Sequence, residues 1–82
     1  MNLNNTVEIL DMTKYTLDEI TELLNEGKTL IMALEKGEHV NASLNESFSK
    51  YLNANIKLKE EKENCGTCGC GQPANILVYV WK

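Results

Sequence analysis

The residues best suited to chemistry are three cysteines that lie close together in a glycine-rich segment: Cys65, Cys68 and Cys70. Three thiolates on one tight turn are typical ligands of zinc or of another thiophilic metal. A structural zinc site needs a fourth ligand, and Asp11 is the candidate, because the strand expected at 6–12 ends near the cluster. A cysteine of a second copy, an exogenous thiol or a water are the alternatives for that position.

The same cysteines allow three other interpretations. Cys65 and Cys68 have the C-x-x-C spacing of dithiol exchange, but such pairs usually lie at a helix N-terminus, which lowers the thiol pKa. Here an expected helix end and the acidic residues Glu60, Glu61 and Glu63 precede the cysteines and disfavour a thiolate. An iron–sulfur cluster would need a fourth cysteine or a dimer. The third interpretation is free thiols in a connecting loop without any ligand.

No other group of residues predicts catalysis. The sequence has one histidine, His39, and two aspartates, Asp11 and Asp18, which do not form a convincing acid–base pair. The glycine-rich segment precedes an expected strand and not a helix N-terminus, so it does not resemble a phosphate-binding loop. We therefore expect a protein that is not an enzyme.

The charge of the chain favours a protein partner. The formal net charge is −4, and all eight basic residues are lysines. Nucleic-acid readers depend on arginine and on a basic face, so this class is disfavoured. An acidic surface instead suits a basic patch on another protein. With 82 residues the chain is one domain, residues 1–82, with a modest core that a metal, a cross-link or a second subunit would help to stabilise.

The sequence lacks the signals of a secreted or membrane protein, which favours the cytoplasm. Residues 1–5 have no basic or apolar signal character, and no apolar run approaches the ~18 residues of a membrane span. We therefore expect a cytoplasmic protein that does not contact a membrane, with reduced thiols.

The hydrophobic periodicity predicts an α+β fold with a β-α-α-β order. A short strand is expected at 6–12 and a helix at 16–36, with a capping box formed by Thr16 and Glu19. Gly27 interrupts that helical pattern, so a break with a second helix at 28–36 is the alternative. The remaining elements are a helix at 41–63, the cysteine and glycine loop at 64–74 and a strand at 75–81. The two long helices should form an antiparallel hairpin that packs on a short sheet of the N- and C-terminal strands.

The strand expected at 75–81 is apolar on both faces. The helical hairpin can cover only one of them, so the other face must meet a partner, a second copy or solvent. Tyr79 and Trp81 lie on this strand, and large aromatic residues often anchor interfaces. The sequence therefore favours a small protein-binding module, such as an inhibitor, adaptor or regulator, that forms a homodimer. A metal-binding or thiol-redox protein is the alternative.

Overall fold

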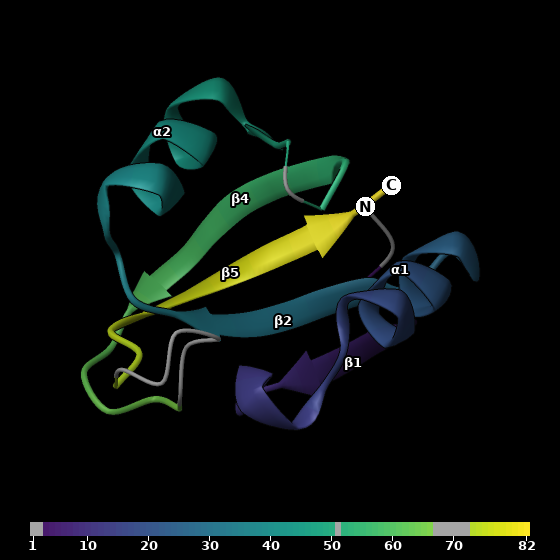
Figure 1. The fold of residues 1–82 in the computed structure, drawn as a ribbon, viewed down its shortest axis with the longest axis horizontal. Helices are drawn as coiled ribbons and strands as arrows, with labels where there is room; N and C mark the ends of the chain where they lie inside the picture. The colour runs from purple at the N-terminus through teal and green to yellow at the C-terminus, as the bar shows by residue number, and fades with distance from the viewer. Residues whose placement is uncertain (1–2, 51, 67–72) are drawn as a thin grey trace.

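The computed structural model describes residues 3–50, 52–66 and 73–82, and these form an α+β fold (Figure 1). In this part of the chain, two α-helices pack on one mixed sheet of five strands in the order β1-β2-β5-β4-β3. The strands are β1 (Thr6–Ile9), β2 (Thr29–Leu34), β3 (Phe48–Ser49), β4 (Ala54–Glu61) and β5 (Ile76–Trp81). The helices are α1 (Leu17–Asn25) and α2 (Glu38–Glu46), and a 3₁₀ turn, η1 (Met12–Lys14), lies between β1 and α1.

The first half of the chain is a β-α-β unit. β1 runs parallel to β2, with Thr6 opposite Thr29 and Ile9 opposite Met32, and α1 makes the crossover between them. The predicted capping box of α1 is confirmed: Thr16 Oγ1 accepts from the Glu19 N–H at 3.2 Å, and Glu19 Oε1 accepts from the Thr16 N–H at 3.1 Å. Both bonds satisfy N–H groups that a helix start leaves without an intrahelical partner.

The prediction of a helix over 16–36 is wrong beyond Asn25, and so is the alternative of a second helix at 28–36. The backbone of Gly27 has φ +84°, a left-handed conformation that ends the helix. The residues that follow form β2, which has β1 on one side and β5 on the other. An apolar run with no polar alternation fits a buried strand as well as a helix, so periodicity alone could not separate the two.

The prediction of a helix over 41–63 is also wrong. Helix α2 starts earlier, at Glu38, and ends at Glu46, after which Ser47 takes a left-handed φ of 57°. β3 and β4 then form an antiparallel hairpin around Asn53, which has φ 52°. The charged residues near the end of that expected helix form the second half of β4, with a register shift between Leu58 and Glu60. The expected hairpin of two long helices is therefore replaced, in the described residues, by two short helices and three further strands.

The C-terminal strand is present where the sequence predicts it, but its position in the sheet differs. β5 lies between β2 and β4 and runs antiparallel to both. The N- and C-terminal strands therefore do not pair with each other, because β2 separates them. Neighbouring strands on both sides pair the backbone of β5, whereas its two apolar faces need cover from outside the sheet.

Both helices lie on one face of the sheet, which we call the helical face. Ile20 and Leu24 of α1 belong to the same core cluster as the inward residues of the strands, and Val40 and Leu44 of α2 pack against it. The buried strand residues of this cluster are Ile9, Leu30, Met32, Ala54, Ile56, Ile76, Val78 and Val80. Side chains alternate along a strand, so the residues between these point to the opposite face.

Candidate functional site

The opposite face of the sheet carries the best candidate site, and no helix of the described residues contributes to it. In register across the sheet, Glu8 of β1 lies opposite Ile31 of β2, Ile31 opposite Tyr79 of β5, and Tyr79 opposite Lys57 of β4. Trp81 lies opposite Asn55 in the next row. We call this surface the open face and define it by six residues: Glu8, Ile31, Asn55, Lys57, Tyr79 and Trp81.

Tyr79 and Trp81, predicted from the sequence as interface residues, lie side by side on the open face. Both side chains are half-buried, although they belong to the central strand. Their neighbours Val78 and Val80 point the other way and are fully buried in the core. Packing of those valines fixes the backbone of β5, so the two aromatic side chains project from a rigid support. Such a support lowers the entropy lost on binding.

The open face changes charge from one side to the other. Glu8 and Lys57 are both exposed, and between them lie the half-buried Ile31 and Tyr79. The ion pairs seen among the described residues join other groups, so neither charge is neutralised by a direct pair there. Sequence reasoning missed Ile31 and Lys57, since it assigned 16–36 and 41–63 to helices. It placed Glu8 in a strand at 6–12, but not beside Ile31. The strand periodicity of two in β2 and β4 is the signal that places them on one surface.

One end of the open face is covered by Cys65, Gly66 and Ala74, which together we call the cysteine segment. Ala33 and Leu77, which point to this side, form a small buried cluster with Ala74, and Cys65 packs against it. Gly66 lies so close to Leu10, the residue that follows β1, that an added Cβ would collide with the Leu10 carbonyl oxygen. The Ala74 N–H also donates to the Gly66 carbonyl at 2.9 Å. Only a glycine fits this close approach.

The predicted metal ligands are only partly within the described residues. Cys65 is half-buried, and its Sγ lies 3.5 Å from the Ile76 carbonyl oxygen, at which it can donate. Cys68 and Cys70 lie outside the described residues. Among the residues that are described, no group of three or more histidine, cysteine or acidic side chains could hold a metal ion. To bind a metal, Cys65 would have to lose its thiol proton and its hydrogen bond to the Ile76 carbonyl oxygen.

Asp11, the predicted fourth ligand, lies at the same end of the sheet as the cysteine segment, because Gly66 packs on Leu10. Its carboxylate caps η1 by accepting from the Thr13 hydroxyl and from the Thr13 N–H. These two bonds, the hydroxyl first, hold the pKa of Asp11 below its usual value. An ionised Asp11 suits a metal, and both bonds from Thr13 go to Oδ1, so a metal at that oxygen atom would compete with Thr13.

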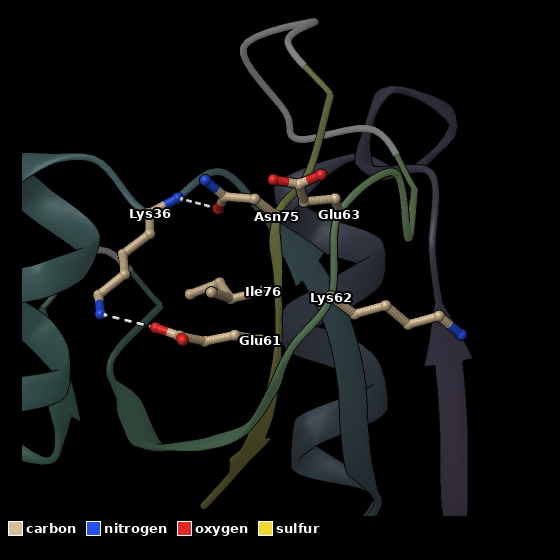
Figure 2. Close-up of a pocket in the computed structure, with 6 residues that line it drawn as sticks. All are labelled: Lys36, Glu61, Lys62, Glu63, Asn75 and Ile76. Carbon is tan, nitrogen blue, oxygen red and sulfur yellow. Dashed lines mark hydrogen bonds and ion pairs between the residues drawn. The ribbon is translucent and has the colours of Figure 1, made fainter.

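A second surface feature is a depression of about 260 Å³ where β4 ends and β5 begins (Figure 2). Its lining residues are Lys36, Glu61, Lys62, Glu63, Asn75 and Ile76. The Lys36 ammonium pairs with Glu61 at 3.2 Å, and the Lys36 N–H donates to Asn75 Oδ1 at 2.7 Å. The Asn75 N–H donates to the Leu34 carbonyl, and the Lys62 N–H donates to the Asn75 carbonyl, both at 3.0 Å. Asn75 therefore joins three strands, and the depression is best explained as this exposed structural joint.

Comparison of the chain with protein-family models, with curated proteins and with solved structures gives no match. No helix within the described ranges is long and apolar enough to cross a membrane. The feature most suited to molecular contact is the open face, which combines two aromatic side chains, a rigid sheet and opposite charges at its two sides.

Proposed function

We propose that this chain is a small acidic protein-binding module, an inhibitor, adaptor or regulator, that binds another protein through the open face. The observation that carries the proposal is the half-exposed pair Tyr79 and Trp81 on the central strand of the sheet. Aromatic residues near the centre of a contact surface commonly supply most of its binding energy. A rigid sheet can present them without rearrangement, which favours binding over chemical catalysis.

The charge of the chain indicates the kind of partner. The formal net charge of −4 favours a partner with a basic surface, because opposite potentials accelerate association. On the open face itself, Glu8 and Lys57 would orient the partner, since each end of the row of residues attracts the opposite charge. We also propose that the protein works as a homodimer in the cytoplasm, because so short a chain buries little surface by itself.

A second candidate function is metal binding by Cys65, Cys68 and Cys70, with zinc as the metal and Asp11 as a further ligand. The observation that favours it is the close packing of Gly66 on Leu10, which keeps Cys65 and the residue before Asp11 together. Native mass spectrometry and elemental analysis of protein purified without chelators would test it. Stoichiometric zinc that is lost in a Cys65→Ser variant supports the site. Metal-free protein with three rapidly labelled thiols refutes it.

The first experiment on the protein-binding function is site-specific photo-crosslinking in cells. A photoreactive residue at position 57 lies on the open face, whereas the same residue at position 22 lies on the exposed side of α1. We expect a discrete adduct with a protein of different sequence from position 57 and not from position 22. Equal adducts from both positions, or none from position 57, would count against the open face.

The second experiment measures affinity for the captured partner by titration calorimetry. Tyr79→Ala and Trp81→Ala should each raise the Kd by about 30-fold or more, as expected for residues that anchor an interface. Leu17→Ala is the matched control, because Leu17 is a 42% exposed apolar residue on α1, away from the open face. Circular dichroism must show that all three variants are folded. Unchanged affinity in both aromatic variants would refute the role of this face.

A further inference from the structure

The two edges of the sheet differ in how well they are protected from pairing with another strand. At one edge, β3 has only two residues, and the outer half of β4 carries several charges and a register shift. Short strands, charged side chains and bulges are features that keep sheet edges from pairing. At the other edge, β1 is a regular strand of four residues with Glu8 as its one charged residue. Figure 1 shows β1 at this edge of the sheet, beside β2.

The outer side of β1 presents hydrogen-bonding groups of the backbone. The Asn5 carbonyl accepts a hydrogen bond from the Thr29 N–H. In the parallel ladder between β1 and β2, this bond determines which alternate residues of β1 direct their backbone N–H and C=O groups towards β2. Asn5, Val7 and Ile9 therefore direct their backbone groups to β2, and Thr6 and Glu8 direct theirs outward. No strand of the described residues lies on that outer side. Unpaired groups of this kind readily add another strand.

We propose that the strand that pairs with this edge is β1 of a second copy, antiparallel, about a two-fold axis at Val7. In this register Thr6 lies opposite Glu8 of the second copy, and each would donate its N–H to the carbonyl of the other. The like-charged alternative, with Glu8 opposite Glu8 of the second copy, is disfavoured by repulsion. The exposed apolar residues Leu3 and Leu10, which are 58% and 38% exposed, flank the strand and would add buried surface.

The symmetry of this pairing has a consequence for the open face. A two-fold axis perpendicular to the sheet leaves both copies with the same face upward and joins their strands into one continuous sheet. The two open faces then lie on the same side, and a partner with two sites could bind both at once. This inference names the surface behind the proposed homodimer but does not depend on whether Tyr79 and Trp81 bind another protein.

The charge at position 6 provides the test, because Thr6 is exposed and its side chain lies opposite Glu8 of the second copy. Thr6→Lys places an ammonium beside that carboxylate and should lower the Kd of the dimer, whereas Thr6→Glu should raise it. Each change is expected to be about three- to tenfold, as measured by sedimentation equilibrium. The two shifts should diminish in high salt. When Glu8 is also replaced by lysine, Thr6→Lys should raise the Kd of the dimer and Thr6→Glu should lower it.

Three results would overturn the proposal. The first is a monomer at all concentrations up to about 1 mM, well above the range of specific dimers. The second is a dimer with equal Kd in Thr6→Lys and Thr6→Glu. Tyr79→Ser is the control variant and should leave the dimer intact. Loss of the dimer in this variant would be the third contrary result, because it would place the contact between the two copies on the open face instead. Failure of partner capture with an intact, charge-sensitive dimer would refute the proposed function alone.

Discussion

The two faces of the sheet are built from the same strands, yet they differ in how deeply their side chains are buried. On the helical face, Leu30, Val78 and Val80 are completely buried beneath α1 and α2. On the open face, the residues next to them in sequence, Ile31 and Tyr79, stay half-buried. The helical face therefore holds most of the buried core, and the open face retains partly exposed apolar surface.

The contrast between adjacent residues explains why apolar character alone is a poor guide to function. β2 and β5 are apolar on both sides, and only the position of the two helices determines which side becomes core. Exposed aromatic residues on a central strand are costly to solvate, and a protein surface of this kind usually marks an interaction site. The predictions below test how complete this separation between the two faces is.

The largest expected effect is the difference between Leu30→Ala and Ile31→Ala, which alter adjacent residues of β2 on opposite faces. Leu30→Ala leaves a cavity in the core and should lower the free energy of unfolding by about 3 kcal/mol. Ile31→Ala removes half-exposed surface and should lower it by about 1 kcal/mol. Urea denaturation of both variants would measure the difference in the free energy of unfolding, and equal m-values would show that the two variants unfold in the same way. Equal losses would mean that the open face is part of the core.

Some of this architecture could be predicted from the sequence, where local chemistry determines the structure. The capping box of Thr16 and Glu19 and the strand at 75–81 are both confirmed, because each depends on neighbouring residues. The helix end at Gly27 was recognised only as an alternative. The residues after it form β2, and their conformation is determined by pairing with β1 and β5, which is distant in sequence.

The candidate site was predictable only in part, for the same physical reason. Tyr79 and Trp81 could be assigned to an uncovered strand face, since that required one strand alone. Glu8, Ile31 and Lys57 join them through the register of four strands, which no local pattern contains. Lys57 lies in a lysine- and glutamate-rich segment with low strand propensity, and its pairing with β5 overrides that propensity.

A second prediction concerns the place where the cysteine segment covers the open face. Gly66→Ala brings a methyl group against the Leu10 carbonyl and should destabilise the fold by about 1–3 kcal/mol. Gly37→Ala is the matched control, since an added Cβ there meets nothing within 4 Å. Its effect should stay within about 0.5 kcal/mol, because a weaker helix cap and a stiffer unfolded chain offset each other.

The same pair of variants tests whether this cover protects Cys65. In a background where Cys68 and Cys70 are serine, Cys65 is the sole thiol, and its labelling rate by a thiol reagent reports the opening of the segment. Gly66→Ala should increase that rate, and Gly37→Ala should not. An unchanged rate together with unchanged stability would show that the close approach at Leu10 does not hold the segment on the sheet.

The smallest expected effect is the pH response of Asp11, where the chain turns from β1 towards the helical face. Hydrogen bonds from Thr13 lower the pKa of Asp11 in the folded state, so its contribution to stability is present above the unfolded value of about 3.9. That contribution is lost as the pH falls through the lower folded pKa. Asp11→Asn keeps an acceptor for Thr13 without the titrating charge and should remove this part of the pH dependence.

An NMR titration can assign that response to one face. The Thr13 amide resonance should shift with a midpoint below 3.9 in the native chain and stay constant in Asp11→Asn. The Tyr79 amide should not follow that midpoint, because β5 presents Tyr79 to the open face and Asp11 caps η1, whose Met12 packs on the helical side. A common midpoint for both amides would mean that the two faces respond to Asp11 as one unit, and that the open face is not an independent surface.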